Sequence, residues 1–169
     1  MPSAVRPPQL NGYQWLVREL IRQLFSMVLI PVFRAWYGTA QTQVQQQQLQ
    51  LLPSGTVGRA VADLLAAHHL QLIPRYEDHD LKHVLLGYDM TPADELKLKA
   101  FMLGNGDWSL PSIVLSLLAV LTPEIWPELW RHYQRGRRAP CIVQWTLADY
   151  AAQNLEALRQ QIGLCSAIQ

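Results

Sequence analysis

The stretch 77–95, EDHDLKHVLLGYDMTPADE, contains the signals for two helices and for the reversal between them. Acidic residues at its start favour the amino end of a helix, and Gly87 is a typical carboxyl-terminal stop. A threonine–proline pair at Thr91 is a strong start signal, because threonine caps a helix and proline fits its first turn. The short connection predicts that helices 77–87 and 91–103 pack antiparallel.

Four side chains of this stretch can meet between the two helices. His79 and His83 lie one turn apart on the same face, so both imidazoles can point at one site. Asp80 lies next to His79 around the helix, and Glu95 lies in the first turns of the returning helix. Imidazole and carboxylate ligands together suit a divalent metal, and we expect zinc before magnesium, manganese or iron. The alternative is that all four side chains are solvated surface groups.

The remaining sequence predicts helices and no long strand. Apolar residues recur at three- and four-residue spacing over 13–37, where Pro31 should kink the helix. The glutamine-rich segment 39–50 fits either a helix or a polar linker. Further helices are expected over 57–70, 111–121, 123–134 and 142–162. We therefore expect an all-α single domain of about seven helices over 13–169, preceded by a flexible leader over 1–12.

Composition narrows the class of protein. Half of the 169 residues are apolar and 16% are charged, which is low against a usual ~25% and argues against disorder. A net charge of +1 excludes a strongly basic nucleic-acid binder. The low charge instead indicates a lipid-facing surface or a large apolar pocket. Cys141 and Cys165 form no disulfide framework, so we expect a reduced, intracellular setting.

The apolar runs without a charge are too short to cross a membrane. Residues 23–33 and 108–123 are eleven and sixteen residues long, and a spanning helix needs about 20 apolar residues. We expect the second run to form a helix that is buried on most sides. The first ten residues lack the apolar core of a secretory signal, so a soluble or peripherally attached protein is expected.

Four arginines gather at the end of the expected helix 123–134. They are Arg131, Arg135, Arg137 and Arg138. Cations favour the carboxyl end of a helix, and arginine binds phosphate in a bidentate way. The group can hold an anionic head group or lipid phosphates, or it can be a solvated helix end.

The metal-site residues also resemble a known signature. HDxxH at 79–83, followed by eleven residues and Glu95, is similar to the motif of the Coq-four family of coenzyme Q biosynthesis proteins. His79, Asp80, His83 and Glu95 match that motif position by position. Similarity continues in LPSGTVGR at 52–59, HVLLG at 83–87, RGRRA at 135–139 and the segment 155–163. The resemblance covers about two thirds of the chain, roughly residues 52–164.

The resemblance implies an all-helical fold, a divalent metal held by these four residues, and a long apolar cavity for a polyprenyl tail. It also implies ubiquinone biosynthesis and peripheral attachment to a membrane. Since the chain is short and has no mitochondrial presequence, we expect a bacterial homologue at the cytoplasmic face of the membrane. The apolar amino-terminal helix further suggests a homodimer, and we expect no nucleic-acid partner.

Three functions stay open at this point. The first is a metal-dependent enzyme in which the four motif residues catalyse oxidative decarboxylation of a prenylated aromatic head group. The second is a non-catalytic scaffold that binds a prenyl lipid and presents it to a biosynthetic complex. The third is an HD-type phosphohydrolase, which would need His68 or His69 and Asp149 as further ligands and leaves Glu95 without a role.

Overall fold

The computed structural model describes residues 12–23, 40–73, 75–109, 112–113, 116–117 and 119–164. These residues form helices and no β-strand, and their isolated β-bridge joins Thr56 to Asn154. The all-α single-domain prediction is confirmed. No helix among the described residues is long and apolar enough to cross a membrane.

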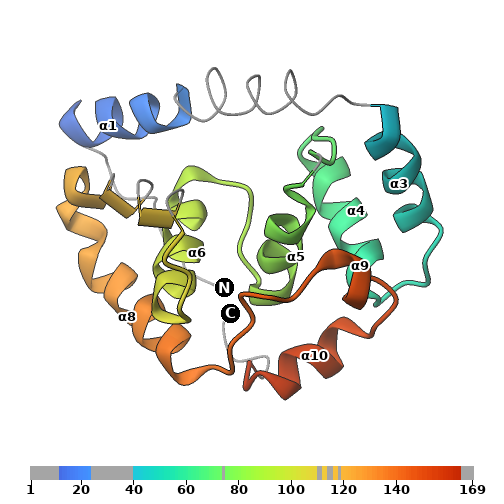
Figure 1. Cartoon of the computed structure of the whole chain (residues 1–169). Coiled ribbons are helices and arrows are strands. Elements are labelled where there is room, and N and C mark those ends of the chain that lie inside the picture. The colour runs from blue at the N-terminus through green and yellow to red at the C-terminus, as the bar shows by residue number, and fades with distance from the viewer. Residues whose placement is uncertain are drawn as a thin grey trace, which may run out of the picture.

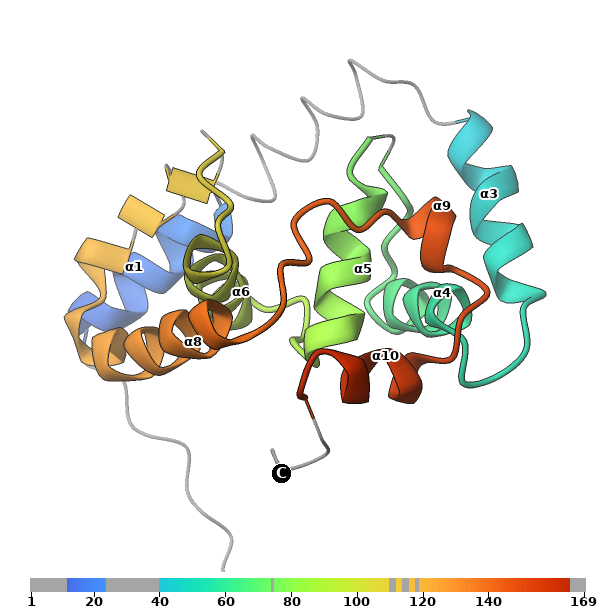
Figure 2. The ribbon, with the colours of Figure 1, turned by 60° about the horizontal axis from the view of Figure 1, so that its bottom comes forward.

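The α-helices are α1 (Gly12–Gln23), α3 (Ala40–Gln50), α4 (Val57–Ala67), α5 (Glu77–Leu86), α6 (Pro92–Gly104), α8 (Trp126–Arg138), α9 (Leu147–Tyr150) and α10 (Leu155–Gln161). Two short 3-10 helices, η2 (Ala119–Leu121) and η3 (Pro123–Ile125), precede α8. Figures 1 and 2 show α1, α6 and α8 side by side, with α3, α4, α9 and α10 on the other side of α5. The glutamine-rich segment is therefore a helix, α3.

Helix α5 lies in the middle of the molecule, and its residues 80–86 are all buried. The largest fully buried side chains include Phe101, Leu65, Leu81, Leu85, Leu98, Ile142, Leu147, Ile162 and His83. A histidine thus belongs to the core together with aliphatic side chains. Buried polar groups need partners, and α5 finds partners for His83 in α6 and for Lys82 in the segment before α9.

Two glycines bring α6 and α8 into backbone contact. A Cβ atom added to Gly104 would lie 2.1 Å from the Tyr133 carbonyl oxygen, and one added to Gly136 would lie 2.0 Å from the Phe101 carbonyl oxygen. Asn105 then ties the two helices together, because its side-chain amide donates to the carbonyl of Gly136 at 3.1 Å and its oxygen accepts from Ile142 N at 2.8 Å. The position of α8 against α6 is therefore fixed by the backbone.

The predicted single helix over 142–162 is wrong. Residues 142–146 are not helical, and the rest divides into α9 and α10. Thr146 accepts a hydrogen bond from Asp149 N, and Asn154 accepts one from Ala157 N, so each begins a new helix. The bridge between Asn154 and Thr56 holds the interruption in place.

The structure confirms the start of the predicted amino-terminal helix and contradicts the predicted burial of the run 108–123. Helix α1 confirms the start of the predicted helix 13–37, whereas residues 24–39, with Pro31, lie outside the described residues. The run 108–123 was expected to be buried on most sides, and this is wrong for most of its described side chains, although Ser112 and Thr122 are buried. Trp108 is 66% exposed, and Leu117 and Val120 are each 62% exposed. Apolar character alone did not indicate which face of this run meets the core.

Candidate metal centre

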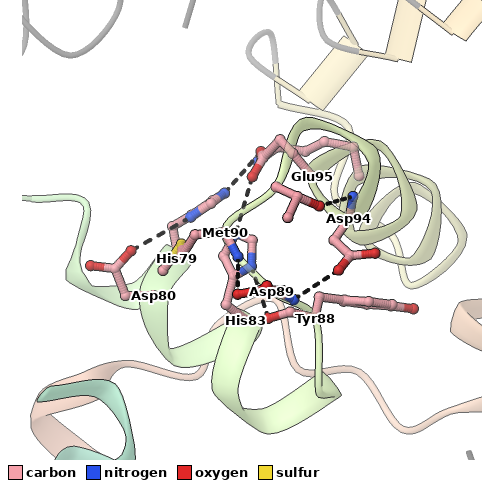
Figure 3. A network of polar contacts seen from close by, with 10 residues as sticks. His79, Asp80, His83, Tyr88, Asp89, Met90, Asp94 and Glu95 are labelled. Atoms are coloured by element: carbon pink, nitrogen blue, oxygen red, sulfur yellow. Dashed lines mark hydrogen bonds and ion pairs between the residues drawn. The ribbon is translucent and has the colours of Figure 1, made fainter. Parts of the chain in front are cut away.

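The two helix signals of the motif hairpin are confirmed. Gly87 follows α5 with a left-handed φ of 74°, a conformation that glycine adopts without strain. Thr91 Oγ1 accepts a hydrogen bond from Asp94 N at 3.2 Å and caps α6. The reversal between them brings the face of α5 that carries the histidines against the first turns of α6 (Figure 3).

Three side chains converge between α5 and α6. His79 Nε2 lies 3.0 Å from Glu95 Oε1, and His83 Nε2 lies 3.0 Å from Glu95 Oε2. Figure 3 shows both imidazoles aimed at the same carboxylate. One ligand atom from each residue lies within 4.8 Å of the other two. His83 is fully buried, and Glu95 is nearly so. These three side chains can hold a metal ion.

The partners of the two ring nitrogens of His83 indicate that a cation suits this site. His83 Nδ1 lies 3.3 Å from the Tyr88 carbonyl oxygen, which only accepts hydrogen bonds, so Nδ1 carries a proton. Without an ion, the contact between Nε2 and Glu95 needs a second buried proton, on the ring or on the carboxyl group. With an ion at Nε2, the neutral ring satisfies both contacts. The donor set therefore fits a divalent metal.

Asp80 lies behind His79 rather than among the three converging side chains. Its Oδ1 is 3.8 Å from His79 Nδ1, the ring nitrogen that faces away from Glu95. His79 Nδ1 is buried and makes no hydrogen bond among the described residues. A carboxylate at that position stabilises the ring orientation in which Nε2 faces the site. The structure thus brings three of the four motif residues to one point and places Asp80 beside one of them.

Two buried lysines near the site were not singled out from the sequence. Lys99 Nζ lies 3.5 Å from Glu95 Oε1, one turn further along α6, and is 5% exposed. Lys82 is 6% exposed and donates to the Trp145 carbonyl at 2.6 Å, and burial lowers its pKa. The sequence could have indicated Lys99 through its four-residue spacing from Glu95, because residues four apart share a helix face.

A cavity of about 300 Å³ opens beside His79. Lys82, Lys99 and Tyr76 line it, together with apolar Leu98, Met102 and Val143. The Tyr76 ring stacks on His79 with centroids 4.3 Å apart. Burial raises the pKa of Tyr76, and the charges of Glu95 and Asp80 raise it further, so the phenol stays protonated. Arg75, Asp78 and Asp107 also line the cavity, which therefore combines an aromatic wall with three cations and two carboxylates.

The turn before α6 is tied to α8. The Tyr88 hydroxyl lies 2.6 Å from His132 Nδ1, while the carbonyl of the same tyrosine contacts His83. Burial raises the pKa of Tyr88 to about 12, and burial lowers the pKa of His132. These two uncharged side chains keep the Tyr88 carbonyl in position, and that carbonyl requires the proton of His83 to be on Nδ1.

The other predicted site residues lie elsewhere. The four arginines, Arg131, Arg135, Arg137 and Arg138, belong to α8, which extends four residues beyond its predicted end, and none joins the three ligands. His68 contacts Asp89 at 2.5 Å, and Asp149 accepts from Thr146. Neither His68, His69 nor Asp149 joins the three converging residues in the described part of the chain. The geometry gives the phosphohydrolase alternative no support.

Acid should weaken metal binding at this site. Burial alone would lower the pKa of His79, but the charge of Glu95 together with the contacts that Glu95 and Asp80 make with the ring outweighs burial, and the net pKa is raised above 6.5. A proton on His79 must therefore leave when an ion binds, so affinity should fall about tenfold for each pH unit below that raised pKa. Calorimetry in two buffers of different ionisation enthalpy measures the protons released. Binding with no proton release at pH 6.5 would contradict this assignment.

Comparisons with known proteins point to the same motif family, although no family profile matches the chain. The chain is 29% identical to the human protein named ubiquinone biosynthesis protein COQ4 homolog, mitochondrial, over 146 aligned positions. It is 30% identical to the COQ4 homolog of Bos taurus. Each alignment covers 69% of this chain and 53% of the relative. The chain thus spans about half the length of the curated relatives it matches.

The fold has a counterpart among solved structures. It is similar to the crystal structure of a candidate ubiquinone biosynthesis protein from Nostoc punctiforme, with a TM-score of 0.52 and 20% identity. That similarity covers 92% of this chain and 83% of the other. The helical hairpin that presents His79, His83 and Glu95 therefore lies in a fold shared with that protein. The sequence comparisons support a Coq-four-like family for this chain, and the solved structure supports its fold.

Proposed function

We propose that this chain is a metal-dependent protein of ubiquinone biosynthesis that acts on the aromatic head group of a polyprenylated precursor. The observation that carries the proposal is the convergence of His79, His83 and Glu95 beside a cavity with two buried lysines. The names of the similar proteins support the pathway.

In this proposal His79, His83 and Glu95 hold a divalent ion. Two imidazoles and one carboxylate form the ligand set of open zinc sites and of non-haem iron sites, so zinc, iron, manganese and magnesium are the ions to test. Three protein ligands leave positions for water or substrate. A bound ion would polarise a substrate oxygen or lower the pKa of a bound water.

The charges around the site favour an anionic head group. The carboxylates of Glu95 and Asp80 offset a divalent ion, and the other charged residues that line the cavity leave one positive charge in excess, since Arg75, Lys82 and Lys99 face Asp78 and Asp107. Buried charges need a partner. An aromatic carboxylate supplies that charge, and its ring can pack against Tyr76 in a cavity at the small end of ligand sites. Oxidative decarboxylation would replace the carboxylate with a hydroxyl whose oxygen comes from water and would release CO₂. Two electrons and two protons would pass to an acceptor such as dioxygen, which becomes hydrogen peroxide.

A second cavity supports the lipid part of the proposal. An apolar groove of about 480 Å³ lies between α6 and α8 and is lined by Leu96, Leu103, Leu129 and three tryptophans. The tryptophans, Trp108, Trp126 and Trp130, are 50% to 66% exposed. Tryptophan favours the boundary between lipid and water. We propose that this face contacts a membrane and the prenyl tail of the precursor.

A scaffold that binds the precursor without turnover is the second candidate. It is favoured because charged groups that line the cavity already have hydrogen-bond or ion-pair partners in the protein. Lys82 is bonded to a backbone carbonyl, Lys99 is paired with Glu95, and Asp107 accepts from Ser112 at 2.5 Å. None of these three is poised as an acid or base. Such a site can clamp a head group with no chemistry of its own.

Turnover separates the two candidates. Protein loaded with each metal in turn is incubated under air with a 4-hydroxybenzoate carrying a short prenyl chain and a labelled carboxyl group. An enzyme releases labelled CO₂, and Glu95→Gln abolishes the release. A scaffold retains the compound unchanged and loses it on chelation. A protein that neither turns over nor retains the compound contradicts both.

Lys99→Met should separate anion binding from metal binding. The variant removes the cation beside Glu95, so the carboxylate should hold an ion at least as tightly as before. Binding of 4-hydroxybenzoate to the metal-loaded protein should weaken about tenfold, because a charged hydrogen bond is lost. Lys97→Met is the control, since Lys97 pairs with Asp94 and Glu128 outside the cavity. Equal benzoate affinity in the two variants would contradict the role of Lys99.

A further inference from the structure

Helix α8 contributes to a second polar cavity, which shares no lining residue with the one beside His79. The cavity measures about 560 Å³. Arg131, Arg135 and Arg138 line it together with Trp130, Ile162 and Leu164. None of its lining residues is acidic. The site thus offers three positive charges and an apolar wall.

The arginines of α8 have no carboxylate partners in the described part of the chain. Arg59 pairs with Asp63 at 2.9 Å, and Arg159 pairs with Glu156 at 2.6 Å. No ion pair of this kind involves any of the four arginines of α8 among the described residues. Four neighbouring cations without counter-charge favour the approach of an anion.

The helix dipole accounts for only part of this arrangement. Cations in the last turn are stabilised by the free carbonyls there, which suits Arg135, Arg137 and Arg138. Arg131 lies about two turns before the end of α8, beyond the reach of that effect. Its position one turn before Arg135 instead places both side chains on the face that lines the cavity.

The cavity wall is held by neighbouring structure. The Arg135 guanidinium carbon lies 5.8 Å from the centroid of the Phe101 ring, and Arg131 Nε donates to the Pro127 carbonyl at 3.4 Å. Gly136, in backbone contact with Phe101, fixes the helix itself. Two of the three guanidinium groups are therefore oriented before any ligand arrives.

We propose that this cavity binds the phosphate group of a phosphate ester that carries an apolar substituent. Guanidinium groups bind phosphate oxygens in pairs, and several are needed to neutralise a dianion. Trp130, Ile162 and Leu164 offer the substituent an apolar surface, and Trp130 also lines the groove between α6 and α8. The ester can be a phospholipid head group or a soluble molecule. The site requires no metal, so it stands apart from the proposed function.

The test measures phosphate binding with two probes. One is inorganic pyrophosphate, followed by calorimetry, and the other is vesicle co-sedimentation with phosphatidic acid in phosphatidylcholine, against phosphatidylcholine alone. Both are run with chelator present. Arg138→Gln should weaken binding about tenfold. Arg137→Gln removes the same charge from a neighbour that does not line the cavity, and it should change binding less than about twofold.

Each outcome decides the proposal. Loss of vesicle binding alone in Arg138→Gln identifies a lipid head group, and loss of pyrophosphate binding alone identifies a soluble ester. Loss of both supports one phosphate site open to either source. Equal losses in Arg137→Gln, binding that disappears with chelator, or no binding of either probe by the unchanged protein would overturn the proposal. Circular dichroism on both variants confirms that α8 remains folded.

Discussion

Glu95→Gln is expected to lower metal affinity by about 100-fold or more. The substitution keeps the shape of the side chain but removes the negative charge on which both histidines converge. Loss of groups that merely orient a ligand costs about 10- to 100-fold, and Glu95 is proposed to bind the ion directly. An ion at 100 times its Kd stabilises the unchanged protein by about 2.7 kcal/mol. Thermal melting should therefore show a metal-dependent rise of roughly 5–10 °C that the variant lacks.

Asp80→Asn provides the matched control for this experiment. It also exchanges a buried carboxylate for an amide, but at a position 3.8 Å behind His79 rather than between the histidines. We expect a loss of about tenfold, smaller than that of Glu95→Gln. If the two variants lost metal affinity equally, Asp80 would be a fourth ligand, as the motif resemblance implied. If Glu95→Gln kept the metal-dependent rise, the assignment of the centre would fail.

Gly136→Ala should destabilise the fold by about 3 kcal/mol. The new methyl group would lie 2.0 Å from the Phe101 carbonyl oxygen, and a backbone atom cannot swing away as a side chain does. Helices α6 and α8 would have to separate, which would also strain the hydrogen bonds of Asn105. The higher helix propensity of alanine offsets only about 1 kcal/mol. Urea unfolding measures the change in free energy.

Gly12→Ala is the control for the glycine contact. A Cβ atom at Gly12 would meet no atom within 4 Å among the described residues, apart from its chain neighbours and the backbone of its own helix. Alanine there should leave stability unchanged or raise it slightly. A Gly136→Ala protein as stable as Gly12→Ala would show that the two helices are not held in backbone contact.

The candidate metal centre was predictable because its signals are local. The Thr91 cap, the Gly87 stop and the four-residue spacing of His79 and His83 all lie within nineteen residues. A short antiparallel connection then leaves few ways to place Glu95. Helical spacing places all four motif residues close together but does not show in which direction each side chain points. The sequence therefore did not distinguish Asp80 from the three converging residues.

The surroundings of the centre depend on contacts between distant parts of the chain. Lys82 finds its partner 63 residues away in the Trp145 carbonyl, and Tyr88 finds His132 44 residues away. Sequence periodicity carries no information on such pairs, so a lysine looks solvated until its partner is known. The division of 142–162 into α9 and α10 also depends on a distant contact, the bridge to Thr56.

A calorimetric titration of chelator-stripped protein with zinc, iron(II) and manganese tests the central claim most directly. We predict that at least one of these ions binds saturably, with one ion per chain, and that Glu95→Gln and His83→Ala abolish the binding. The result that would contradict the account is the absence of saturable binding for all three ions at pH 7.5 by a protein whose circular dichroism shows it folded. Binding that survives both substitutions would contradict it equally, since the ion would then lie elsewhere.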